Sequence, residues 1–191
     1  MTCIVGIFAG GIVYMGADSA GINADSITIR ADEKIFILKN RFLIGYTSSF
    51  RMGQLLRFSF RPPPQKKGQN DYEYMCTMFI NSVIKCFNRG GFGKRDEDEE
   101  ISGGQFLVGY KGNLYTINAD FDVGKPADAY DAVGCGQDLA LGSLYTTEKN
   151  NLTPQERINL ALEAAAKFST SVRPPFISLT IGEKKTRTIK K

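Results

Sequence analysis

The chain has 191 residues, of which 42% are hydrophobic, 11% aromatic and 23% charged. This composition is that of an ordinary globular protein and excludes the disordered, collagen-like and coiled-coil classes. The length is near the prior of about 150 residues per domain, so we expect one domain over residues 1–191. The chain contains no histidine, which excludes Ser-His-Asp and Cys-His catalysis and every metal site that needs an imidazole.

The formal net charge is +4, from 24 basic and 20 acidic residues. Five basic residues lie in a tail at 183–191, so the remainder is close to neutral, and we expect no nucleic-acid partner. No apolar run approaches the roughly 20 residues of a membrane span, and the N-terminus lacks the features of a secretory signal. We therefore expect no membrane association and a cytoplasmic location.

The four cysteines have no CxxC spacing and do not suggest a disulfide scaffold, so we expect reduced thiols. They are Cys3, Cys76, Cys86 and Cys135.

The first part of the chain is typical of β-strands, with short apolar or alternating runs separated by turn residues. The predicted strands cover residues 3–8, 12–17, 25–30, 34–38 and 42–46. Hairpin turns are predicted at residues 9–11 and 39–41. We expect these strands to pair in one sheet.

Two helices are predicted next. Phe50, Leu55, Leu56 and Phe58 have the spacing of one helix face, with Ser48 or Ser49 as the N-cap and three prolines at 62–64 as the end. A second helix is predicted over 71–88, with an apolar stripe that we assign to the core. The stripe consists of Tyr74, Met75, Met78, Phe79, Val83 and Phe87.

Residues 89–103 combine glycines with an acidic run and predict a mobile surface loop. The acidic run lacks the ligand spacing of an EF-hand, and the glycines lack the spacing of a phosphate-binding loop.

The rest of the chain predicts strands at 105–110, 114–117 and 129–133, two helices ending near 146 and 167, and a last strand at 176–181. The second of these helices has a capping box at Thr153-Pro154-Gln155-Glu156. The order is strands, two helices, strands, two helices, strand. It predicts an α+β fold, a four-layer αββα sandwich with two antiparallel sheets between helix layers.

Thr2 is a candidate nucleophile. Removal of Met1 would leave Thr2 with a free α-amine beside its own hydroxyl, and an α-amine has an ordinary pKa of about 7.7–8.0. It can therefore accept the hydroxyl proton, so one residue supplies both nucleophile and base without histidine. A nearby ammonium would lower the pKa of this amine.

Three motifs carry a family resemblance. The chain begins Thr2-Cys3-Ile4-Val5-Gly6 after Met1, and continues with Gly16-Ala17-Asp18-Ser19 and Ala132-Val133-Gly134-Cys135-Gly136. Asp18 follows Thr2 by 16 residues and Lys34 follows it by 32. In these features the chain resembles the proteasome β-subunits and their relative HslV, among the N-terminal nucleophile hydrolases.

The resemblance implies a role for each matching residue. Thr2 is the nucleophile and its amine the base, Lys34 is the cation that lowers the pKa of the amine, and Asp18 holds Lys34. Ser48 lies where the family has its glycine-rich oxyanion loop, in which backbone N–H groups act. Cys135 replaces a supporting serine. The family's late aspartate and serine are missing near 169–174.

The function implied is that of an N-terminal-threonine peptidase. It would cleave peptides or unfolded proteins as a homo-oligomeric ring, with an ATPase unfoldase as partner and with no metal or organic cofactor. Two alternatives stay open: an inactive assembly or binding protein that retains Met1, and an amidase that acts on a small molecule. For Asp18 and Lys34, the alternative to catalysis is a structural ion pair.

Overall fold

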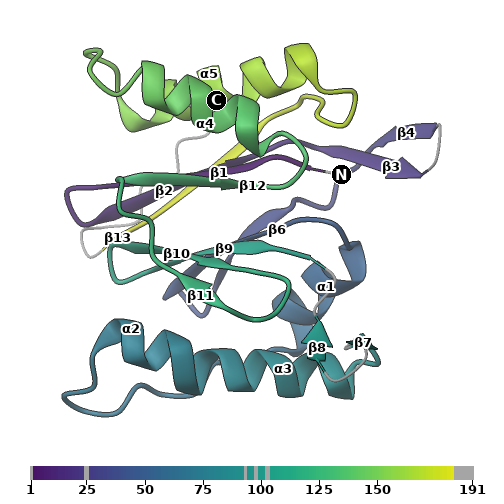
Figure 1. The fold of residues 1–191 in the computed structure, drawn as a ribbon, viewed down its shortest axis with the longest axis vertical. Helices are drawn as coiled ribbons and strands as arrows, with labels where there is room; N and C mark the ends of the chain where they lie inside the picture. Colours follow the sequence, from purple (N-terminus) through teal and green to yellow (C-terminus); the bar gives the residue numbers. More distant parts are fainter. Residues whose placement is uncertain (1, 24–25, 93, 97–98, 102–103, 183–191) are drawn as a thin grey trace.

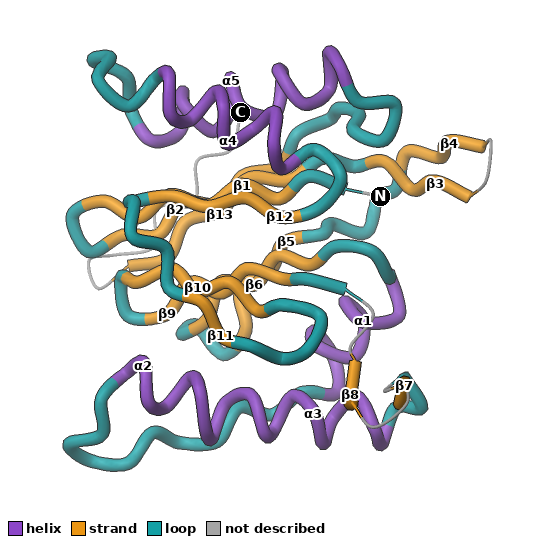
Figure 2. Tube along the Cα trace, viewed as in Figure 1, coloured by secondary structure: helices purple, strands orange, loops and turns teal. Residues whose placement is uncertain are grey.

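The computed structural model describes residues 2–23, 26–92, 94–96, 99–101 and 104–182. Two antiparallel sheets lie face to face, and helices cover the outer face of each (Figures 1 and 2). The predicted αββα sandwich is confirmed.

The first sheet has the order β12-β1-β2-β13. Its strands are β1 (Ile4–Ala9), β2 (Ile12–Ala17), β12 (Tyr130–Val133) and β13 (Ile177–Gly182). The tight turn between β1 and β2 requires positive φ at Gly10 and Gly11. The pairing of Ile4 with Ala17 sets the start of β1 beside the end of β2.

The second sheet has the order β11-β10-β9-β6-β5. Its strands are β5 (Ile35–Leu38), β6 (Phe42–Tyr46), β9 (Phe106–Tyr110), β10 (Asn113–Ile117) and β11 (Val123–Gly124).

Helices α4 (Gln137–Thr146) and α5 (Pro154–Phe168) cover the first sheet. The predicted capping box forms at the start of α5, between the Thr153 and Glu156 side chains and backbone N–H groups. Over the second sheet, α1 (Phe50–Gln54) continues as a π-helical segment, Leu55–Ser59. Helix α2 (Asp71–Tyr74) runs through a π-helical segment (Met75–Phe79) into α3 (Ile80–Arg89).

The expectation of one sheet for all the early strands is wrong. The hairpin β1–β2 lies in the first sheet and the hairpin β5–β6 in the second. The reason is visible in β1, where Val5 packs in the core on the helix side and Ile4 in the core between the sheets. Strands with apolar residues on both faces must be covered on both faces, and here helices cover one face of β1 and the second sheet covers the other.

The predicted strand at 25–30 is one half of a separate two-stranded ribbon. It consists of β3 (Ala20–Asn23) and β4 (Ser26–Ile29). Figure 1 shows this ribbon extending from the end of the sandwich at which the N-terminus lies.

Phe58 was expected on the buried face of the first helix, but it is 67% exposed. The π-helical segment has more residues per turn than an α-helix, so it rotates the side chains after Leu55 away from the predicted face.

The predicted loop at 89–103 contains two short paired strands, β7 (Lys94–Asp96) and β8 (Glu99–Ile101). Residues 93, 97–98 and 102–103 and the basic tail at 183–191 lie outside the described residues. Within the described ranges, none of the helices has both the length and the apolar content needed to cross a membrane.

Candidate active site

The ends of strands bring the predicted site residues to one end of the sandwich. Thr2 lies just before β1, Asp18 directly after β2 and Lys34 directly before β5. Ser48 follows β6, and Cys135 follows β12. Neighbouring antiparallel strands run in opposite directions, so the first residue of one strand lies beside the last residue of the next. The site residues therefore come together at one end of the sandwich although they precede some strands and follow others.

Asp18 and Lys34 form a buried ion pair. Lys34 Nζ lies 2.8 Å from Asp18 Oδ1, and the side chains are 2% and 0% exposed respectively. Asp18 Oδ1 also accepts the backbone N–H of Cys3 at 3.0 Å, and Asp18 Oδ2 accepts that of Ala20 at 3.0 Å. These hydrogen bonds fix the carboxylate and place the ammonium next to the peptide that joins Thr2 to Cys3.

Burial lowers the pKa of Lys34, while the charge and hydrogen bond of Asp18 act in the opposite direction. Burial disfavours the charged ammonium because it removes hydration. Lys34 is therefore a cation that loses its proton more readily than an ordinary lysine.

Thr2 is buried, and the segment after β12 holds its backbone. Its carbonyl accepts the N–H of Gly136 at 3.3 Å. Gly134 has φ +98°, and a Cβ at this position would lie 2.3 Å from the Thr2 carbonyl oxygen. Only glycine fits such a close approach in this backbone region.

Ser48 has a left-handed backbone with φ +64°, the conformation that a glycine would adopt most easily. The preceding residue is anchored, because Thr47 Oγ1 donates to the Gln105 carbonyl at 2.8 Å. Among the described residues, no backbone or side-chain acceptor pairs with the Ser48 N–H. Ser48 is exposed, so this donor lies at the surface of the site.

The two cysteines near the site, Cys3 and Cys135, differ in their exposure to solvent. Cys3 is fully buried, and burial raises the pKa of its thiol to about 12, so it is not a nucleophile at neutral pH. Cys135 is exposed, and a thiolate there would act electrostatically on Lys34 and Cys3.

The segment at 169–175 also reaches Asp18. The backbone N–H of Arg173 lies 3.4 Å from Asp18 Oδ2, and the Ser19 N–H donates to the Arg173 carbonyl at 3.0 Å. Ser19 Oγ donates to the Pro175 carbonyl at 2.6 Å. Sequence reasoning gave Ser19 and Arg173 no role at the site, because backbone groups make most of these contacts and side-chain type does not reveal them.

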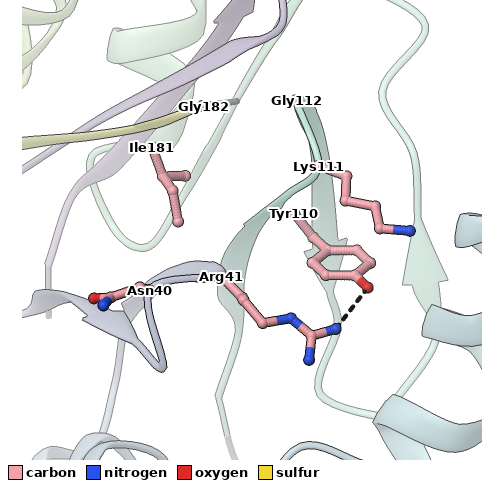
Figure 3. Close-up of a pocket in the computed structure, with 7 residues that line it drawn as sticks. All are labelled: Asn40, Arg41, Tyr110, Lys111, Gly112, Ile181 and Gly182. Atoms are coloured by element: carbon pink, nitrogen blue, oxygen red, sulfur yellow. Dashed lines mark hydrogen bonds between the residues drawn. The ribbon is translucent and has the colours of Figure 1, made fainter. Parts of the chain in front are cut away.

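A pocket of about 280 Å³ lies at the opposite end of the strands from the predicted site residues, where β5 turns into β6 and β9 into β10. Figure 3 shows Arg41 pointing toward Tyr110, whose hydroxyl accepts its hydrogen bond at 3.2 Å. None of the predicted site residues lines this pocket. In the part of the chain that the structure describes, no three His, Cys, Asp or Glu side chains gather as metal ligands.

No protein-family model matches the chain, and no curated protein does. Solved structures do match. BPH from Thiobacillus denitrificans, in complex with epoxomicin, has a TM-score of 0.80 at 20% identity, over 96% of this chain and all of that one. Eukaryotic HslV from Trypanosoma brucei has a TM-score of 0.69 at 13% identity, over 95% of this chain and all of that one.

Anbu from Yersinia bercovieri has a TM-score of 0.65 at 13% identity, over 95% of this chain and 82% of that one. These likenesses extend over nearly the full chain and agree with the observed layers and strand orders. The chain therefore has the fold of the proteasome-like N-terminal nucleophile hydrolases.

Proposed function

We propose that the chain is an N-terminal-threonine peptidase whose nucleophile is Thr2 after removal of Met1. The observation that carries the proposal is the buried Lys34–Asp18 pair, held against the backbone of the residue that follows Thr2. A buried ion pair is a poor stabilising device, since apolar residues of similar volume often do as well or better. A cation beside the Thr2 amine would lower the pKa of that amine, so the buried pair has a use in catalysis that stability alone does not give it.

In the proposed reaction, the Thr2 hydroxyl oxygen attacks a peptide carbonyl carbon while the Thr2 α-amine takes the hydroxyl proton. Lys34 keeps the amine neutral by lowering its pKa, and Asp18 holds Lys34. The Ser48 N–H stabilises the oxyanion. The C–N bond then breaks, and the leaving amine takes the proton from the Thr2 amine. Water hydrolyses the threonine ester that remains.

The test combines intact mass with labelling. We expect the mature protein to lack Met1, to bind epoxomicin, the ligand of the BPH structure, and to cleave unfolded casein. Thr2→Ala should abolish binding and cleavage. Thr77→Ala removes a threonine hydroxyl from an exposed helix position and should change neither.

Other outcomes identify the alternatives. A mature protein that retains Met1 has its Thr2 nitrogen blocked as an amide, which contradicts the proposal and favours an assembly or binding role. Thr2-dependent hydrolysis of a small amide, without cleavage of any peptide, favours an amidase.

We further propose that the chain works as a homo-oligomeric ring served by an ATPase unfoldase in the cytoplasm. Native mass spectrometry tests the ring directly.

A further inference from the structure

A pocket of about 360 Å³ opens along the edge where β12 of the first sheet faces β10 and β11 of the second. We call it the side pocket. Its lining contains both polar and apolar groups and comes from strands of both sheets, from the loops between them and from α4. Its polar lining residues are Gln105, Thr116, Asn118, Lys125, Asp131 and Gln137.

Two sets of contacts link the lining of the side pocket to the candidate active site. Gln105 exchanges hydrogen bonds with Thr47, which precedes Ser48. Val133 precedes Gly134, which contacts the Thr2 carbonyl, and the Gln137 N–H donates to the Gly134 carbonyl at 3.0 Å. The segments that hold Thr2 and Ser48 therefore also form part of the pocket wall.

Several polar side chains of the pocket lining already have hydrogen-bond partners within the protein. Gln105 Nε2 donates to Asn118 Oδ1 at 3.0 Å, and Asn118 Nδ2 donates to Asp122 Oδ2 at 3.1 Å. Asp131 accepts hydrogen bonds from the Thr116 hydroxyl and from the Ala132 N–H. These contacts hold the wall in one arrangement before any ligand arrives.

Other groups at the pocket have no partner among the residues that the structure describes. They are the Gln137 side-chain amide and the side-chain oxygen Oε1 of Gln105, whose Nε2 is the atom that donates to Asn118. The pocket thus offers both a donor and an acceptor. Lys125 and Asp131 bring opposite charges to the lining, so its formal net charge is zero.

We infer that the side pocket is a substrate subsite that selects an uncharged hydrogen-bonding side chain, of the asparagine or glutamine type. This inference rests on the proposed function. A carboxamide can pair with both the side-chain amide of Gln137 and the side-chain Oε1 of Gln105. An apolar side chain would leave these groups unpaired, and a charged one would lose hydration without a net counter-charge.

The test uses sets of quenched fluorescent peptides. Within a set, the peptides differ at one residue, which is Gln, Glu, Lys or Leu. Each set varies a different position beside the cleaved bond. At one position, we expect kcat/KM for the Gln peptide to exceed that for the other three by about tenfold. In Gln137→Leu this preference should fall to within about twofold, because the pocket loses its donor. Gln105→Leu removes the acceptor and should act in the same direction.

Gln69→Leu is the matched control, since it makes the same change in the loop before α2, outside the pocket. It should keep the preference of the wild type. A wild type without a preference for Gln at any position, or an unchanged preference in Gln137→Leu, overturns the inference while Thr2-dependent cleavage stands. Failure of the proposed function gives a different result: cleavage is absent, or it persists in Thr2→Ala, and the inference falls with it.

Discussion

Lys34 Nζ and the backbone N–H of Cys3 donate to the same oxygen of Asp18, at 2.8 and 3.0 Å. One carboxylate oxygen thus ties the start of β5 to the start of β1, across the two sheets. The contact fixes the position of a buried ammonium relative to the backbone that follows Thr2. It is at once part of the core and part of the candidate site.

Asp18→Asn should therefore harm both stability and activity. The change leaves Lys34 as an unpaired buried cation, which costs about 3–5 kcal/mol of the free energy of unfolding. Asp32→Asn removes the carboxylate of a half-exposed pair with Arg30, whose side chains are 36% and 41% exposed, and should cost about 1 kcal/mol or less. Urea unfolding of both variants measures the difference. If the two variants lose the same free energy of unfolding, the buried Lys34–Asp18 pair does not hold the two sheets together more strongly than a surface pair does.

Peptide cleavage should fall as the pH rises toward the ordinary lysine pKa of 10.5, with a midpoint below that value, because burial lowers the pKa of Lys34. The protonated form is the useful one, and it is lost as the pH passes through the lowered pKa. Unfolded Lys34 keeps its proton to higher pH, so its contribution to the free energy of unfolding rises across the same window. Loss of Lys34's charge therefore does not itself destabilise the fold.

A pH–rate profile, with thermal unfolding at each pH, checks this expectation. Cleavage that stays level up to pH 10.5 in the folded protein would refute the role of Lys34 as a charged group.

The fold was predictable where one local signal sufficed. The hairpin at Gly10-Gly11 and the capping box at Thr153 each depend on residues adjacent in the sequence, and both form as expected. The assignment of hairpins to sheets was not predictable in this way. An apolar strand such as β5 is equally suited to either sheet, and only long-range packing selects one.

The candidate site shows the same division. The resemblance to the proteasome β-subunits and HslV, in spacing from Thr2, predicted Asp18 and Lys34 as partners, and the structure brings them into contact. Their catalytic roles, with those of Thr2, Ser48 and Cys135, stay predictions. The contribution of Arg173 is a backbone N–H, which every residue except proline has, so no residue type could have marked it.

Gly134→Ala should misplace Thr2. A Cβ would lie 2.3 Å from the Thr2 carbonyl oxygen at a φ of +98°, so the backbone must shift. A displacement of about 1 Å at a reacting group costs on the order of 100-fold in rate. Gly142→Ala in α4, where nothing lies within 4 Å of the new Cβ, should raise stability by about 0.5–1 kcal/mol. Peptide cleavage and urea unfolding compare the two, and full activity in Gly134→Ala would contradict the close approach.

Ser48→Gly should retain cleavage, because glycine adopts the observed φ of +64° without strain and keeps the backbone N–H. Ser48→Val should lose stability by about 1–2 kcal/mol, because a β-branched residue is strained in this region. Ser26→Val makes the same change in the exposed strand β4 and should be close to neutral. If Ser48→Val matches Ser26→Val in cleavage and stability, the left-handed conformation at Ser48 is not needed.

Alkylation by iodoacetamide at pH 8 should modify Cys135 and spare Cys3. Cys135 is exposed, whereas Cys3 is buried and its thiol has a pKa of about 12. Because Cys135 lies close enough to act electrostatically on Lys34, the added group should obstruct the site and stop peptide cleavage. Cys135→Ser should keep cleaving after the same treatment, with Cys76 and Cys86 still available to the reagent, so it controls for modification elsewhere. Peptide mapping identifies the modified thiols, and equal inhibition of the wild type and Cys135→Ser would place Cys135 away from the substrate path.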